Sequence, residues 1–256
     1  MQKKYKAYFI DLDGTLYRGK EKIPAASRFI ARLQAQNIPF LVLTNNTTQT
    51  PEVVAANLTK NYDMQIKPEN VFTAGLATAA YIRSLNLGNR VYAIGELGLK
   101  QAILNQGFQF DDLNPDYVVV GLDWDVTYRK FEKATLAIQK GAKFIGTNAD
   151  TNLPNERGLV PGAGSVIALV ERSTQQTATY VGKPQPIMLE AALKQFGLRK
   201  EEAVMVGDNY NTDILAGINT GVDTLLVYTG YSKPADIEKV IVKPTHEIQS
   251  LDEWDV

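Results

Sequence analysis

FIDLDGT, at residues 9–15, sets the interpretation of the whole chain. The apolar run at residues 8–10 is typical of a buried strand, but two aspartates, Asp11 and Asp13, follow it at once. Alternate residues of a strand point to the same face, so either the two carboxylates crowd together or the strand ends and the backbone turns one away. Like charges beside an apolar layer are costly unless a positive group joins them. The stretch therefore predicts a strand end where carboxylates need a positive partner.

Composition limits the classes of protein that the chain can represent. It has 256 residues, 45% of them hydrophobic and 21% charged, which is typical of a globular protein with one large or two small domains. The net charge of −1 provides no basic field, so we expect neither nucleic acid nor an acidic membrane as a partner. No stretch approaches the roughly 20 apolar residues of a membrane span, and the N-terminal apolar run is too short for a signal peptide.

The scarcity of cysteine and histidine narrows the chemistry further. The absence of cysteine excludes disulfides, thiolate nucleophiles and cysteine metal sites, and it suits a reducing, cytoplasmic location. The single histidine, His246, leaves little room for a Ser-His-Asp triad or a multi-histidine zinc site, and we expect it to be a surface residue. Carboxylates are therefore the obvious catalytic groups.

Short strand patterns alternate with helical patterns along almost the whole chain. This alternation is the signature of βαβ units and a mostly parallel sheet, so the predicted fold class is α/β. The strands are too numerous for one compact sheet, which favours two α/β modules with the second inserted into the first. The expected strands are 5–10, 40–44, 71–75, 90–95, 116–123, 143–148, 177–182, 203–207 and 224–230, and the expected helices are 24–36, from 51, up to 85, 96–106, 127–140, 164–173, 185–196 and from 211.

Polar or charged residues occur where four of these strands should end. Each group has an ordinary explanation by itself: Asp-Gly and Asn pairs form turns, a lone lysine is usually solvated, and aspartate often caps a helix. In a parallel α/β sheet, however, the carboxyl ends of the strands line the edge where ligands bind. Four such groups together favour a functional site. They are DLDGT (11–15), TNNTT (44–48), VGKP (181–184) and GDNYNTD (207–213).

The chemistry that suits these groups is phosphoryl transfer. Carboxylates are ligands for Mg²⁺, which also keeps water and substrate phosphate in its coordination shell. Lys183 and the hydroxyl of Thr44 can hold phosphoryl oxygens. One carboxylate can act as a covalent nucleophile, and a second carboxylic acid can protonate the leaving oxygen.

The order of DLDGT, a threonine-ended second strand, a lysine before a helix and GD-x₄-D resembles the haloacid dehalogenase (HAD) superfamily of phosphatases. The stretches DLDGTLYRG, LTNN, DYVVVGLD, ERGLVPGAGS, VGKP and GDNYNTDI are similar to its NagD-like, 4-nitrophenylphosphatase-type subfamily. The resemblance implies a Rossmann-like core with a parallel sheet, formed by residues 1–80 and 179–256. It also implies an inserted α/β cap of the C2 type at 81–178 that determines substrate specificity.

The same resemblance implies roles for the acids. Asp11 corresponds to the nucleophile and Asp13 to the general acid and base. The Asp11 carboxylate, the Asp13 backbone carbonyl and Asp208 correspond to the Mg²⁺ ligands. Asp213 corresponds to a residue that orients the lysine or a metal-bound water.

The phosphate-binding positions correspond to Thr44, Asn45 and Lys183. One departure lies in the cap, where the subfamily commonly has TNPD and this chain has Thr-Asn-Ala-Asp at 147–150. Residues 209–211 either approach the metal-bound water or form the turn that leads into the helix.

The predicted function is therefore Mg²⁺-dependent hydrolysis of a small phosphomonoester, such as a sugar phosphate or a nucleoside monophosphate, through an aspartyl-phosphate. The alternatives are a dehalogenase, a phosphomutase or phosphotransferase on the same core, and a non-catalytic ligand-binding homologue. The second acid, Asp13, argues against a dehalogenase. Family analogy also suggests a homodimer formed through the cap.

Overall fold

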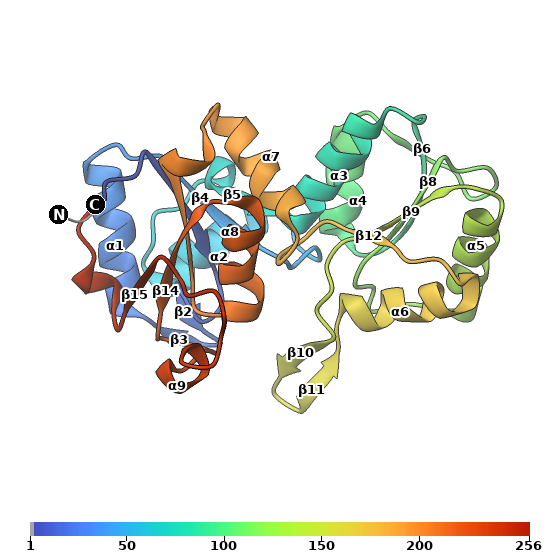
Figure 1. The fold of residues 1–256 in the computed structure, drawn as a ribbon. Coiled ribbons are helices and arrows are strands. Elements are labelled where there is room, and N and C mark those ends of the chain that lie inside the picture. The colour runs from blue at the N-terminus through green and yellow to red at the C-terminus, as the bar shows by residue number, and fades with distance from the viewer. Residues whose placement is uncertain (1–2) are drawn as a thin grey trace. The chain divides into compact units, whose positions relative to one another are not determined.

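The computed structural model describes residues 3–256, which divide into two compact units, each with its own parallel sheet (Figure 1). Unit 1 comprises the chain up to Thr44 together with Pro51–Phe72 and Lys183–Val256. Unit 2 comprises Asn45–Thr50 and Thr73–Gly182. The mixed α/β architecture with parallel sheets is the fold class that the alternating pattern predicts.

The sheet of unit 1 has six strands in the order β15-β14-β13-β1-β4-β5. Hydrogen bonding between β15 and β14, β14 and β13, β13 and β1, and β1 and β4 is parallel throughout. Three of the four central strands are buried along their whole length or all but their last residue, which explains why they read as continuous apolar runs. The bounds are β1 Ala7–Asp11, β4 Phe40–Thr44, β5 Val71–Thr73, β13 Ala203–Gly207, β14 Asp223–Val227 and β15 His246–Ile248.

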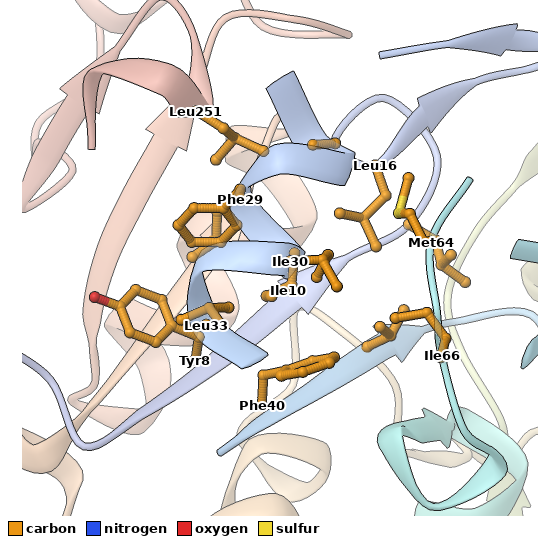
Figure 2. Packing of buried hydrophobic residues seen from close by; sticks show 14 of the residues in the cluster. Tyr8, Ile10, Leu16, Phe29, Ile30, Leu33, Phe40, Met64, Ile66 and Leu251 are labelled. Carbon is orange, nitrogen blue, oxygen red and sulfur yellow. The ribbon is translucent and has the colours of Figure 1, made fainter. Parts of the chain in front are cut away.

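The helices of unit 1 begin where the sequence places their start signals. Prolines occupy the first positions of α1, α2 and α7, where a missing N–H costs nothing. The predicted apolar face of α1, formed by Phe29, Ile30 and Leu33, is buried in the core, where Figure 2 shows it packing beside Tyr8 and Leu251. The helices are α1 Pro24–Ala35, α2 Pro51–Tyr62, α7 Pro186–Phe196, α8 Leu215–Thr220 and α9 Pro234–Ile237, with short helical turns η1 Pro68–Asn70, η2 Lys200–Glu202, η3 Tyr210–Ile214 and η4 Leu251–Glu253.

Unit 2 is built on a five-stranded sheet in the order β12-β9-β8-β6-β7, in which every neighbouring pair is parallel. Its core lies between β6, β8 and β9 and the helices α5 and α6. The strands are β6 Arg90–Ile94, β7 Gln109–Phe110, β8 Tyr117–Val120, β9 Lys143–Gly146 and β12 Thr179–Tyr180, and the helices are α3 Ala74–Leu85, α4 Leu97–Asn105, α5 Tyr128–Gln139 and α6 Ala163–Thr174. Within residues 3–256, no helix combines the length and apolarity that a membrane span requires.

Several of the shortest elements, of two to four residues, were missed by the sequence, because such short segments show no measurable periodicity. They include two antiparallel hairpins, β2 Tyr17–Arg18 with β3 Glu21–Lys22, and β10 Asn152–Asn155 with β11 Gly158–Pro161. The strand β15 was also missed. His246 begins this strand and is only partly exposed, because its ring packs beside the rings of Tyr5 and Trp254.

Candidate active site

Three adjacent strands of unit 1 end with the residues that the sequence singled out. β1 ends at Asp11, β4 ends at Thr44, and Asp208 directly follows β13. Because β1 lies between β13 and β4 and runs parallel to both, the three ends meet at one edge of the sheet. The carboxylates of Asp11 and Asp13 do not crowd together on one face of the strand. The strand ends at Asp11, the backbone turns, and the side chain of Asp13 is exposed.

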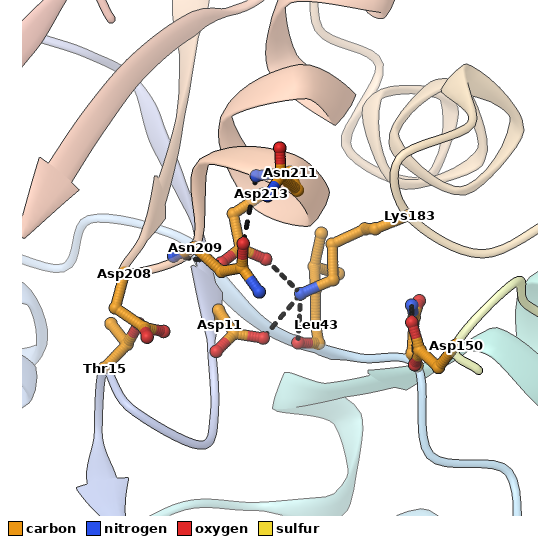
Figure 3. A network of polar contacts seen from close by, with 10 residues as sticks. Asp11, Thr15, Leu43, Asp150, Lys183, Asp208, Asn209, Asn211 and Asp213 are labelled. Carbon is orange, nitrogen blue, oxygen red and sulfur yellow. Dashed lines mark hydrogen bonds and ion pairs between the residues drawn. The ribbon is translucent and has the colours of Figure 1, made fainter. Parts of the chain in front are cut away.

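Lys183 is the positive group at this edge. Its side chain is only 2% exposed, and its Nζ lies 2.5 Å from Asp11 Oδ1 and 2.7 Å from Asp213 Oδ1 (Figure 3). It also approaches the Leu43 carbonyl oxygen at 3.4 Å. A lysine far along the chain thus bridges the first strand and η3. Such burial is rare for lysine unless the charge is paired.

The two carboxylates keep this lysine charged. Burial by itself lowers the pKa of Lys183, but Asp11 and Asp213 outweigh it and raise the pKa above its ordinary value. Burial, together with the charges of Asp213 and Asp208, raises the pKa of Asp11 well above its usual range, against the opposing effect of Lys183. The site therefore carries more negative charge than its one ammonium can balance.

Asp208 is held by hydrogen bonds to both of its carboxylate oxygens. The Thr15 hydroxyl donates to Oδ1 at 3.1 Å, and the Tyr231 backbone N–H donates to Oδ2 at 2.6 Å. Burial and the nearby Asp213 raise the pKa of Asp208 to about 6, although these two hydrogen bonds act in the opposite direction. Each oxygen accepts one bond, and a carboxylate oxygen has capacity for a further partner.

The turn after Asp11 exposes the side chain of Asp13 and sets the direction of the Asp13 backbone carbonyl. Asp13 Oδ1 accepts a hydrogen bond from the Gly19 N–H at 3.0 Å. The Gly14 N–H donates to the Tyr17 carbonyl at 2.6 Å, and since N–H and C=O point in opposite directions across a trans peptide, the Asp13 carbonyl points away from Tyr17. Gly14 has a φ of +96°, which a residue with a side chain rarely adopts.

Asp213 and residues 209–211 form the turn that enters α8. The Asp213 carboxylate accepts the Asn209 N–H through Oδ2 while its Oδ1 faces Lys183, and Asn209 Oδ1 accepts the Asn211 N–H at 2.9 Å. The Tyr210 hydroxyl donates to the Val242 carbonyl at 2.7 Å. These contacts place residues 209–211 in the turn, and an approach of these residues to a metal-bound water stays a prediction.

Asn45 belongs to unit 2, although it directly follows Thr44. Its side-chain amide donates to both carboxylate oxygens of Asp150 at 3.2 Å, and Asn148 Nδ2 donates to the Asn45 carbonyl at 2.8 Å. Asn148 Oδ1 in turn accepts the Asp150 N–H at 3.1 Å, so a side-chain turn shapes the loop that carries alanine in place of proline. The predicted role of Asn45 in phosphate binding stays a prediction.

The acidic residues fit a hard divalent cation. Among residues 3–256, Asp11, Asp208 and Asp213 form a group whose offered carboxylate oxygens all lie within 4.8 Å of one another. Three carboxylates against the single ammonium of Lys183 leave two negative charges, which one divalent ion would balance. Oxygen-only donors are those that Mg²⁺ and related ions prefer.

Sequence reasoning missed the loop at residues 229–232, which contacts Asp208 and Gly14. The only local signal was a polar Thr-Gly-Tyr-Ser run that begins within the last two residues of the predicted strand 224–230. Such a run usually forms a turn, so its contacts with a distant loop are visible only in three dimensions.

A Rossmann-like parallel sheet with several aspartates and a buried lysine at the carboxyl ends of its strands is typical of hydrolases that act on phosphate esters. Comparison with known proteins agrees: models of the haloacid dehalogenase-like hydrolases match residues 8–109 and 180–254. The chain belongs to this family and is a phosphatase of the NagD and 4-nitrophenylphosphatase type, as the sequence motifs indicated.

The relatives resemble this chain along nearly its entire length. It is 47% identical to the 5′-nucleotidase YutF of Bacillus subtilis (strain 168), with 98% of each chain covered. It is 46% identical to the acid sugar phosphatase of Staphylococcus aureus (strain USA300), covering 98% of this chain and 97% of the relative. Among solved structures, a double mutant of the thermostable NPPase from Geobacillus stearothermophilus has 51% identity and a TM-score of 0.93, with 99% of each chain covered. NagD from E. coli K-12 has 33% identity and the same TM-score and coverage.

Proposed function

We propose that this phosphatase is a Mg²⁺-dependent phosphomonoester hydrolase that acts through an aspartyl-phosphate formed on Asp11. The observation that carries the proposal is the pairing of Asp11 with the buried Lys183 at the edge where Asp208 also lies. A carboxylate held at 2.5 Å from an ammonium is oriented and partly neutralised, which favours its approach to a negatively charged phosphate.

In the first step, an Asp11 carboxylate oxygen attacks phosphorus while the bond to the leaving oxygen breaks. Asp13, whose side chain is exposed, donates a proton to that oxygen. In the second step, Asp13 takes a proton from water as the water attacks phosphorus, and the bond to Asp11 breaks to release inorganic phosphate. Lys183 and Thr44 bind the phosphoryl oxygens in both steps.

The Asp11 and Asp208 carboxylates and the Asp13 carbonyl are the groups proposed to hold Mg²⁺. When bound, this ion would neutralise charge on the phosphoryl group. Asp213, which accepts from Lys183 at 2.7 Å, holds the ammonium in place.

Unit 2 is proposed to select the leaving group, as the inserted cap predicted at 81–178 would do. The names of the relatives support two substrate classes, nucleoside monophosphates and sugar phosphates. Release of free phosphate from a panel of both classes, with and without Mg²⁺, distinguishes hydrolysis from transfer to a second hydroxyl. A homodimer through the cap stays a prediction, which light scattering would check.

The proposal is tested with Asp11→Asn, measured on 4-nitrophenyl phosphate with Mg²⁺. The variant should lose turnover, and the acid-quenched wild-type enzyme should carry one phosphoryl group on the peptide that contains Asp11. Asp252→Asn makes the same change in a surface ion pair with Arg28 and should stay active. Full activity of Asp11→Asn, or activity that chelation of metal leaves unchanged, would contradict the mechanism.

A further inference from the structure

Residues 229–232, Thr-Gly-Tyr-Ser, form a short loop directly beyond β14 in unit 1, and we call it the Asp208 clamp. It contacts two parts of the candidate site that are far away in the sequence: Asp208 and the turn at Gly14. None of its residues belongs to the motifs that point to phosphoryl transfer. Through these contacts it packs against two of the segments that are proposed to hold the metal ion.

The clamp holds Asp208 through both its main chain and its side chain. The Ser232 N–H donates to the Asp208 carbonyl at 3.0 Å, and the Tyr231 N–H donates to the Asp208 carboxylate at 2.6 Å. Gly230 packs so closely that an added Cβ would lie 2.1 Å from Asp208 Oδ2. Any larger residue at position 230 would therefore have to displace the carboxylate.

The clamp also holds the turn that presents the Asp13 carbonyl. The Thr229 hydroxyl donates to the Gly14 carbonyl at 2.6 Å, and an added Cβ at Gly230 would lie 2.8 Å from Gly14 Cα. The Gly14 N–H is already bound by Tyr17 at 2.6 Å. Both peptide groups of Gly14 are thus fixed by hydrogen bonds, and Thr229 supplies one of them.

We propose that Thr229 is a positioning residue for the metal site: through Gly14 it fixes the Asp13 carbonyl, while the rest of the clamp fixes the Asp208 carboxylate. The inference rests on the proposed function, because it concerns the same two oxygen donors. Hydrogen bonds that hold a metal ligand and the peptide groups next to it in place reduce the reorganisation needed when the ion binds. Thr229 thus sets the affinity for the metal rather than the affinity for the substrate.

The test compares Mg²⁺ binding by wild type, Thr229→Val and Thr229→Ser, measured by calorimetry in the absence of substrate. Valine keeps the shape but loses the hydroxyl, whereas serine keeps the donor. Thr229→Val should weaken Mg²⁺ binding about 10–100-fold, and Thr229→Ser should bind nearly as wild type does. The KM for 4-nitrophenyl phosphate at saturating Mg²⁺ should stay unchanged. Thr245→Val is the matched control, since it removes a hydroxyl that binds the Thr224 N–H at the other end of β14.

Equal Mg²⁺ affinity of wild type and Thr229→Val would overturn the inference while leaving the proposed function intact. Wild-type enzyme that neither binds Mg²⁺ nor needs it for activity would overturn both. If Thr229→Val does not fold, the Mg²⁺ affinities of Thr229→Ala and Thr229→Ser are compared instead, because only serine retains the hydroxyl donor. Equal Mg²⁺ affinity of these two variants would also overturn the inference.

Discussion

Replacing Lys183 with methionine should destabilise unit 1 strongly, because it leaves the buried carboxylate of Asp213 and the mostly buried carboxylate of Asp11 without their cation. Lys183 is 2% exposed, and its ammonium lies 2.5 Å from Asp11 and 2.7 Å from Asp213. Methionine preserves most of the apolar volume of the side chain, so the loss comes from the charge. The carboxylates of Asp11 and Asp213 would then repel each other.

The magnitude follows from these two distances. At an effective dielectric constant of about 20, each ion pair contributes about 6 kcal/mol of attraction. Burial of the ammonium and the carboxylates costs several kcal/mol per ion and offsets much of this. Removing one partner of a buried pair typically costs about 3–5 kcal/mol, and we expect Lys183→Met to fall in this range.

The assay is urea unfolding at pH 7 in the presence of a metal chelator, followed by tryptophan fluorescence. The chain has two tryptophans, of which Trp254 is buried in unit 1 and Trp124 is exposed in unit 2. A Trp124→Phe background makes the signal report on unit 1 alone. Adding Asp213→Asn to Lys183→Met should restore part of the lost stability, because one uncompensated charge disappears.

The control is Lys3→Met, which makes the same substitution in an exposed ion pair. Lys3 lies 2.6 Å from Asp223, but its side chain is 44% exposed, so its loss should cost no more than about 1 kcal/mol. If Lys183→Met lost no more stability than Lys3→Met, the electrostatic account of the site would be wrong.

Three further predictions concern other parts of unit 1, each measured by urea unfolding in the same Trp124→Phe background. Gly207→Ala places a Cβ 2.3 Å from the Asp213 Cβ, so it should cost about 1–3 kcal/mol and reduce turnover of 4-nitrophenyl phosphate by displacing Asp213. Phe29→Ala, in the fully buried face of α1, should cost about 3–5 kcal/mol. Burial lowers the pKa of His246, so its contribution to stability should be present above the unfolded pKa of about 6.5 and decline as the pH falls through that value toward the folded pKa. His246→Gln should flatten this decline.

Each of these predictions has a clear contrary result. Wild-type stability and turnover in Gly207→Ala would mean that the strand shifts to make room. Stability of Phe29→Ala close to that of wild type would place the side chain outside the core. If His246→Gln left the pH dependence of stability unchanged, groups other than His246 would cause the loss of stability at acid pH.

The sequence by itself determined the alternation of the longer strands and helices, the fold class and most of the residues at the strand ends. Apolar runs such as 40–44, N-terminal prolines such as Pro51 and the abrupt acids after Ile10 are local signals, because they reflect burial and backbone geometry over a few residues. A parallel sheet then brings the ends of its strands to one edge. The sequence could therefore name Asp11 and Asp208 as neighbours without any coordinates.

Only the tertiary structure decided which of these side chains contact one another. It placed the ammonium of Lys183 between Asp11 and Asp213, and it directed the Asn45 amide to Asp150. It also brought the loop at 229–232 against Asp208. Such contacts depend on strand order and on the paths of loops between strands. A local pattern carries no record of either, because a polar turn has the same composition whether it faces water or holds a carboxylate in place.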